Sequence, residues 1–270
     1  MRDVPSAEAC LRFGVDTDAL RLLPGGQGKT WSDGRLVLKP VGPSAEHTFR
    51  CEVYAAWRSP AVRVPEPVAT DRGDWSADGW GAHVLLPGRD ARLLDELAVV
   101  REAADAFHDA LRGLPRPAFL DERDDPWSYG DRLAFEGAEP IGDAATLAVV
   151  DRLLVHLAPV SAPEQVIHGD VLTNVVVEDG RPPGLIDWPV YFRPAAFALA
   201  VVATDAVTFH GAPVSLLDDW ATGTDWDQLV LRALLYRLGP TGVFAQQRRL
   251  RGPLVTHVER LEPLLDAVLG

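Results

Sequence analysis

The chain has 270 residues, of which 47% are hydrophobic and 24% charged. This is enough to bury a core in one large domain or two lobes, and it excludes a disordered chain. A formal net charge of −13 argues against nucleic-acid and membrane-surface partners and is compatible with a cationic substrate. With only Cys10 and Cys51 as cysteines, and no apolar leader at the N-terminus, we expect a cytoplasmic protein.

Residues 1–86 have the pattern of β-hairpins around one helix. Asp33-Gly34 and Asp78-Gly79 are two-residue hairpin turns between apolar runs. A strand over 36–39 and a helix over 44–57 lie between these two turns. Pro87-Gly88 then interrupts the pattern, so we place a boundary there between a β-rich lobe, 1–86, and a second lobe, 87–270.

The second lobe is predicted to be mainly helical, with one embedded hairpin. Apolar residues recur every three or four positions over 93–114, and Asp143 can cap a helix over 144–157. Strands at 175–177 and 185–186 flank the turn Asp179-Gly180, and helices are predicted from 195 onward. The fold class is therefore predicted to be α+β.

A glycine-rich segment, 25–30, reads GGQGKT. A P-loop would need glycine where Leu23 stands and a helix where Asp33-Gly34 turns the chain, so that motif is rejected. We favour a β-hairpin whose glycines, Gly25, Gly26 and Gly28, let backbone N–H groups approach nucleotide phosphates. A plain glycine-rich turn is the alternative.

Lysine occurs only twice, at Lys29 and Lys39, among 26 basic residues. A compact ammonium group on a phosphate is one role that arginine does not fill well. A strand lysine such as Lys39 would need a carboxylate to hold it, and the following helix offers Glu46 and Glu52. Of the two, Glu52 is predicted to face inward, although a solvated helix face would explain either glutamate.

The segment HGDVLTN, 168–174, followed by a hairpin and Asp187, carries the strongest chemical pattern. Asn174 precedes the first strand and Asp187 follows the second, so pairing about the turn brings both to one end. Their oxygens suit a hard cation such as Mg²⁺. Asp170, four residues before Asn174, is predicted to lie within reach and to accept a proton from a hydroxyl.

This ordered set of motifs resembles the aminoglycoside phosphotransferase family, which is related to protein kinases. It comprises GGQGKTW, LVLK, CEVYAAW, VLLPG, HGD followed by N, and IDW. The resemblance implies a two-lobed protein-kinase-like fold that binds ATP and Mg²⁺ and phosphorylates a small-molecule hydroxyl. The implied site consists of Lys39 paired with Glu52, the backbone from His83 to Leu85 at adenine, Asp170 as base, His168 as a brace of its loop, and Asn174 and Asp187 as metal ligands.

Two departures from the family pattern bear on activity. In the family, the base usually stands five residues before the asparagine, whereas Asp170 stands four residues before Asn174. Ala198 stands where the family has the aspartate of a D-L-A motif that steadies the catalytic loop. We hypothesise that Asp205 substitutes for it. These departures leave open a weakly catalytic, nucleotide-binding regulatory protein.

The acceptor is predicted only as a class. An aminoglycoside or another amino sugar is the first choice, with a choline, homoserine or sugar kinase as the alternative. The net negative charge favours a cationic acceptor, and the acidic residues between 121 and 125 could hold an amine or simply form an acidic loop.

Overall fold

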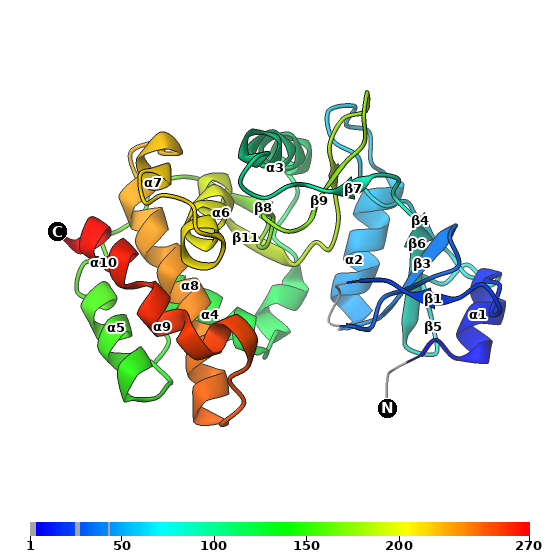
Figure 1. Ribbon diagram of the computed structural model, residues 1–270. Helices are drawn as coiled ribbons and strands as arrows, with labels where there is room; N and C mark the ends of the chain where they lie inside the picture. The colour runs from blue at the N-terminus through cyan, green and yellow to red at the C-terminus, as the bar shows by residue number, and fades with distance from the viewer. Residues whose placement is uncertain (1–3, 25–27, 43) are drawn as a thin grey trace. The chain divides into compact units, whose positions relative to one another are not determined.

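The computed structural model describes residues 4–24, 28–42 and 44–270, and the chain divides into two compact units (Figure 1). The first unit runs to Ala91 and includes the later segment Asn174–Trp188. The second unit comprises Arg92–Thr173 and Pro189–Gly270. The first is rich in strands and the second mainly helical, so the predicted α+β class is confirmed. The hairpin that the sequence suggested for the second lobe lies in the first unit, because it pairs with strands there.

An antiparallel sheet of six strands forms the centre of the first unit. Its order is β1-β2-β3-β6-β4, and β5 also pairs with β6. The strands are β1 (Arg21–Leu22), β2 (Trp31–Ser32), β3 (Leu36–Pro40), β4 (Pro67–Val68), β5 (Ser76–Ala77) and β6 (Trp80–Val84).

Both turns predicted for this sheet are confirmed. Between β2 and β3, Gly34 has φ +90°, and the Asp33 carboxylate accepts the backbone N–H groups of Arg35 and Leu36. Between β5 and β6, Asp78 and Gly79 both have positive φ, as a tight two-residue hairpin requires.

Two helices pack in the first unit. Helix α1 (Ala7–Phe13) begins where Ser6 Oγ accepts the Ala9 N–H at 3.1 Å, and it ends at the left-handed Gly14. Helix α2 (Ser44–Ala55) passes so close to β6 that a side-chain carbon at Gly81 would lie 2.4 Å from the ring of His47. The buried core contains Ala9, Cys10, Phe13, Val15, Leu36, Leu38, Trp80 and Ala82.

A second, three-stranded sheet holds the later hairpin in the first unit. It has the order β10-β9-β7, with β7 (Arg89–Asp90), β9 (Val175–Val177) and β10 (Gly184–Leu185). Arg63 adds a bridge to Gly184 and an ion pair with Glu178 at 2.6 Å. These contacts explain why the hairpin belongs to the unit whose main part ends at Ala91, far earlier in the sequence.

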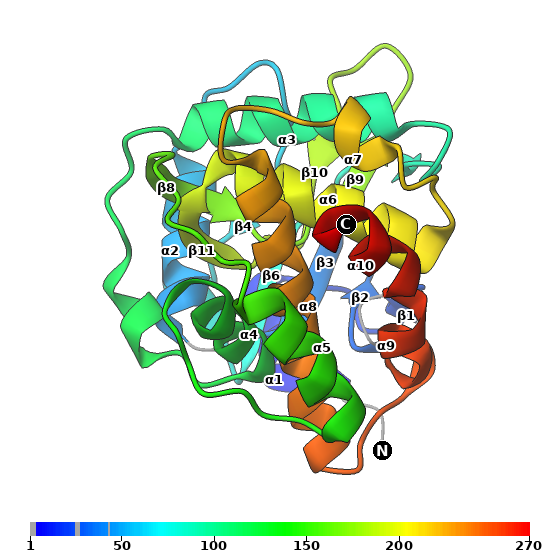
Figure 2. The ribbon, with the colours of Figure 1, turned by 90° about the vertical axis from the view of Figure 1, so that its left-hand side faces the viewer.

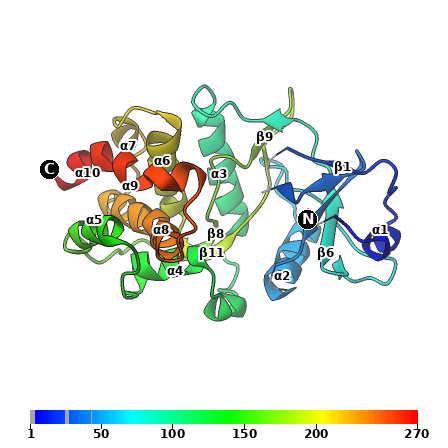
Figure 3. The ribbon, with the colours of Figure 1, turned by 60° about the horizontal axis from the view of Figure 1, so that its bottom comes forward.

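In the second unit, a two-stranded ribbon of β8 (Glu164–His168) and β11 (Val190–Pro194) packs against α3 (Leu97–Leu111) and α6 (Ala195–His210) (Figure 3). Asp143 accepts the Thr146 N–H at 2.9 Å and caps α5 as predicted. Helix α3 begins at Leu97 rather than Leu93, because residues 93–96 form turns ahead of it. The helices are α3 (Leu97–Leu111), η2 (Ala118–Glu122), α4 (Pro126–Phe135), α5 (Ala144–Leu154), α6 (Ala195–His210), α7 (Leu216–Asp219), α8 (Trp226–Gln246), η3 (Gly252–Thr256), α9 (His257–Arg260) and α10 (Glu262–Leu269).

Helix α8 is the central helix of the second unit and packs against α4, α5 and α6 (Figure 2). Glycines allow the close approach of α4 and α8: a side-chain carbon at Gly130 would lie 2.3 Å from the Tyr236 carbonyl oxygen, and one at Gly239 2.4 Å from Gly130 Cα. Pro240 has no N–H to donate to that carbonyl, four residues earlier in the helix. In the described part of the chain, no helix is both long and apolar enough to cross a membrane.

Candidate active site

A cavity of about 350 Å³ in the first unit is lined by cationic side chains. Lys29, Lys39 and Arg50 line it, and Asp187 contributes the carboxylate. Aromatic and small residues from α2 and β6 complete the wall, including Tyr54, Ala82, His83 and Trp188. A hollow with excess positive charge and flat apolar walls is suited to a ligand that is anionic at one end and aromatic at the other.

Lys39 reaches this cavity because of the alternation of strand β3. Leu36 and Leu38 are buried in the core, so Lys39 projects from the opposite face of the strand. Its ammonium group makes an ion pair with the Asp187 carboxylate, and both side chains remain partly exposed. The predicted lysine and the predicted metal-ligating aspartate are therefore direct neighbours.

The hairpin brings Asn174 and Asp187 to one end, as its pattern predicted. Leu185 pairs with Val175, and the Ile186 N–H donates to the Asn174 carbonyl at 2.9 Å. Asp187 has φ +53°, a left-handed conformation that aspartate tolerates better than most residues. Asp187 is therefore aimed by a local bend directly after the strand pair.

Helix α2 fixes the chain immediately after Asp187. The Trp188 ring is buried and stacks on Tyr54 with centroids 5.4 Å apart, and Phe49 contacts it at 5.8 Å. Arg50 Nη1 donates to the Trp188 carbonyl at 3.1 Å. Packing of the aromatic ring and this hydrogen bond both restrict movement of the neighbouring aspartate.

The donor set of Asn174 and Asp187 fits Mg²⁺, since both offer oxygen atoms. Among the described residues, no group of three or more His, Cys, Asp or Glu side chains could hold a metal by itself. Mg²⁺ is commonly held by one or two protein oxygens together with water and substrate phosphates. The two residues would therefore hold the ion together with a nucleotide.

The two glutamates of α2 lie on different faces. Glu46 is buried at 8% exposure, whereas Glu52 is exposed and does not line the cavity. The expected inward position of Glu52 is therefore wrong. The side of α2 that faces the cavity carries residues 47, 50, 51 and 54. Successive residues of a helix are rotated by about 100°, so Glu52, the residue after Cys51, points away from the cavity.

The glycine-rich segment connects two antiparallel strands. The Leu23 N–H donates to the Thr30 carbonyl at 2.8 Å, and the chain continues into β2 rather than a helix. This agrees with the hairpin interpretation and with the rejection of a P-loop. Gly28 has φ +72° with open space around it, while Gly25 and Gly26 lie outside the described residues.

His83 and Leu85 take different positions. His83 lines the cavity, where burial and the nearby Lys39 charge lower its pKa to about 3. Leu85 lines a separate groove, and its N–H donates to the Arg35 carbonyl at 2.9 Å. The Val84 N–H donates to the Glu66 carbonyl at 2.8 Å. An adenine contact through this backbone remains a prediction.

In the second unit, two histidines brace the loop that carries Asp170. The His168 N–H donates to Nε2 of His108, and the Asp170 N–H donates to Nδ1 of His168, each at 3.1 Å. Burial lowers the pKa of His108 to about 3, so its ring is neutral and can accept. The structural role expected of His168 thus has a geometric basis.

The Asp170 carboxylate is held by an arginine that the sequence analysis did not single out. Arg237 Nη2 donates to Asp170 Oδ1 at 2.7 Å. Arg237 Nε donates to both carboxylate oxygens of Asp205, at 3.0 and 3.1 Å, and Nη2 also pairs with Asp205. Burial alone would lower the pKa of Arg237, but the two carboxylates raise it well above its usual value.

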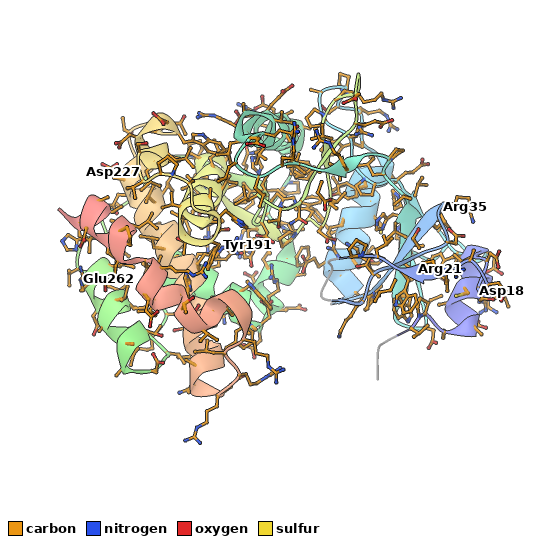
Figure 4. The ribbon with its side chains drawn as sticks, viewed as in Figure 1. Asp18, Arg21, Arg35, Tyr191, Asp227 and Glu262 are labelled. Carbon is orange, nitrogen blue, oxygen red and sulfur yellow. The ribbon has the colours of Figure 1, made fainter. Side chains whose placement is uncertain are left out.

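The acidic residues between 121 and 125 are used in contacts within the second unit. Asp121 pairs with Arg116 at 2.7 Å. Asp125 caps α4 and pairs with Arg123 at 3.1 Å. Tyr191, labelled in Figure 4, lies beneath the guanidinium group of Arg123. These pairs favour the acidic-loop interpretation over an amine site at Asp121 and Asp125.

Solved structures similar to this chain include small-molecule kinases. A microcompartment-associated aminopropanol kinase is 17% identical with TM-score 0.67, covering 96% of each chain. The aminoglycoside phosphotransferase APH(4)-Ia, solved with ADP and hygromycin B, is 17% identical with TM-score 0.62, covering 97% of each chain. A choline kinase from Streptococcus pneumoniae is 12% identical with TM-score 0.61, covering 93% of this chain and 92% of the other. At these identities the likeness shows the kinase-like fold.

The family model named APH, described as the phosphotransferase enzyme family, matches residues 28–235. The chain therefore belongs to this family, as its motifs predicted, and is a small-molecule phosphotransferase. No curated protein matches the chain in sequence.

Proposed function

We propose that the protein transfers the γ-phosphoryl group of ATP to a hydroxyl group of a small, amine-bearing acceptor. The observation that carries this proposal is the cation-lined cavity in which Lys39 pairs with Asp187. A lysine on the phosphates and an aspartate on the metal are the residues this chemistry needs close together. Solved neighbours that include complexes with ADP or AMP-PNP support ATP as the donor.

Each residue of the candidate site has its own proposed role in the phosphoryl transfer. Lys39 and the backbone around Gly28 would bind the phosphates, and Asn174 and Asp187 would hold Mg²⁺, which neutralises charge on the transferred group. The acceptor oxygen forms a bond to the γ-phosphorus as the bond to the bridging oxygen breaks and ADP leaves. Asp170 accepts the proton of the acceptor hydroxyl.

Two observations support an amine-bearing acceptor. The chain carries a net charge of −13, which attracts cations at low ionic strength. The neighbours named for their acceptors act on an aminopropanol, choline or an aminoglycoside. Both cysteines are free and buried, which supports the expected reducing, cytoplasmic location.

An assay of ADP release with Mg²⁺-ATP tests the proposal. The acceptor panel contains amino alcohols, choline, aminoglycosides, neutral sugars and homoserine. We expect release that depends on an amine-bearing acceptor, that is lost in Asp187→Ala and that persists in Asp179→Ala, which removes an exposed carboxylate from the turn of the same hairpin.

Two results would overturn it. Calorimetric binding of ATP without transfer to any acceptor would favour the regulatory alternative. Full transfer by a folded Asp187→Ala protein would remove Asp187 from the metal site.

A further inference from the structure

The side chains that follow the candidate base in its loop are mainly apolar. Val171 and Leu172 are buried at 1% and 2% exposure, and the next residue, Thr173, is exposed. Ala198, at the start of α6, offers no polar group to the loop. Histidines 168 and 108 hold the backbone of this loop.

Arg237 contacts the carboxylate of Asp170 directly. Its guanidinium group spans Asp170 and Asp205, and it lies at 16% exposure while the Asp205 side chain lies at 10%. Asp205 holds one edge of the guanidinium plane through two donors, Nε and Nη2. Asp205 therefore fixes the guanidinium plane of Arg237. Because that plane is rigid, it also fixes the direction of the hydrogen bond to Asp170, which an ammonium group would not do as well.

Helix α8 holds Arg237 rigidly. The preceding residue, Tyr236, packs edge-on against Tyr191 at 5.5 Å, and its hydroxyl donates to the Gly169 carbonyl at 3.4 Å. The Tyr236 carbonyl lies against Gly130 of α4, where no side chain fits. Consecutive residues of one buried helix thus contact Gly169 and Asp170, which are consecutive in the loop.

We propose that Arg237, held by Asp205, is a positioning residue that fixes the rotamer of the Asp170 carboxylate for proton acceptance. The proposal rests on the proposed function, since Asp170 has to be the base. Arg237 acts through Asp170 and from a helix, rather than from the D-L-A position that Ala198 occupies. A shift of a reacting group by about 1 Å can cost about a hundredfold in rate.

The first test compares two arginines of α8. Arg237→Met should lower kcat by about a hundredfold, with the KM for ATP and for acceptor within about threefold of the parent values. Arg232→Met removes another buried arginine of the same helix, one that donates to Gln228 and Ala158, and should leave kcat nearly unchanged. Arg237→Lys should recover part of kcat, because an ammonium group can reach one carboxylate but cannot span both.

The second test separates positioning from a general structural role. In an Asp170→Asn background, adding Arg237→Met should cause no further loss of kcat, because the group it positions is already disabled. Asp205→Asn should lower kcat less than Arg237→Met, and the double variant should match Arg237→Met alone. If Arg237→Met does not fold, Asp205→Asn and Arg237→Lys carry the same comparison.

Several results would overturn the proposal. These are unchanged kcat in folded Arg237→Met, or an equal loss from Arg237→Met in the parent and in Asp170→Asn. Full activity of Asp170→Asn would overturn both the proposal and the assignment of the base. Loss of ATP binding in calorimetry by Arg237→Met would place its effect on nucleotide binding instead. A failure of the proposed function alone differs from these, since no acceptor would then be phosphorylated by the parent protein.

Discussion

Lys29 and Lys39 line the same cavity, and Lys39 lies on strand β3, where it pairs with Gly81 of β6 and makes an ion pair with Asp187. Lys29 lies in the connection between β1 and β2. A cation with a fixed position stabilises developing phosphoryl charge without reorganising. The two lysines therefore form a matched pair for mutagenesis: they carry the same charge, but Lys39 lies on a strand and Lys29 on a connection between strands.

We expect Lys39→Ala to lower kcat by about two orders of magnitude or more, as loss of a preorganised charge does elsewhere. Lys39→Arg should restore only part of it, because the guanidinium plane is larger than the ammonium group that pairs with Asp187. Steady-state kinetics with saturating Mg²⁺-ATP would measure both. A greater loss in Lys29→Ala than in Lys39→Ala would show that the two roles are exchanged.

At the scale of elements, the approach of α4 to α8 depends on glycine. A Gly→Ala change inside a helix usually stabilises it by about 0.5–1 kcal/mol. At Gly130 the added carbon would lie 2.3 Å from the Tyr236 carbonyl oxygen, which is backbone and cannot swing aside. The two helices would have to separate, and α8 would move with Tyr236 and Arg237.

We therefore expect Gly130→Ala to lower the free energy of unfolding by about 1–3 kcal/mol, the usual cost of overpacking. Gly42→Ala is the control, because a side-chain carbon there meets nothing within 4 Å. It should change stability by no more than about 0.5 kcal/mol. Denaturant titration of both variants measures the difference, and a stabilised Gly130→Ala protein would contradict the close approach seen between the helices.

The sequence correctly predicted that Asn174 and Asp187 lie at one end of the hairpin, because the residues that determine this pairing are close together in the chain. Asn174 and Asp187 are thirteen residues apart in the chain, and two short strands with a short connection over 178–183 suffice to pair their neighbours. The prediction that Glu52, rather than Glu46, faces inward was wrong for the opposite reason. Helical periodicity gives the angle between two positions, but which one is buried depends on where β6 packs against α2.

The contact of Arg237 with Asp170 was not predicted from the sequence. It lies sixty-seven residues from Asp170 and thirty-two from Asp205, so no spacing rule connects the three. One signal was present: Arg232 and Arg237 are two arginines within the largely apolar stretch 229–239 of α8. A charge within such a stretch needs a partner, because burying it alone is costly. That argument predicts an acidic partner without identifying it.

For the molecule as a whole, local charge differs from net charge. The chain carries −13, yet the cavity of the first unit has three cationic side chains against one carboxylate. Fields in a partly enclosed hollow are set by the nearest groups, whereas the net charge acts over longer distances. An anionic nucleotide and a cationic acceptor are therefore compatible with the same acidic protein.

Acid sensitivity is a property of the whole molecule, because buried histidines occur in both units. Burial lowers the pKa of His47 and His83 in the first unit, and of His108 and His257 in the second, from the usual value of 6.5. The pKa is about 3 for His108 and about 4 for His257. Between these values and 6.5, the unfolded chain binds protons that the folded protein does not.

The free energy of unfolding should therefore fall as pH decreases below 6.5, by about 1.4 kcal/mol per pH unit for each of His83, His108 and His257. Asp131 and Asp205, whose pKa values burial raises, act in the opposite direction toward the acid end. Denaturant titrations at pH 7.5, 6.5 and 5.5 measure the slope. His108→Gln keeps a side chain able to accept the His168 N–H but cannot titrate, so it should reduce the slope by about one proton. Equal stability at pH 7.5 and 5.5 would contradict the neutral, buried state of these rings.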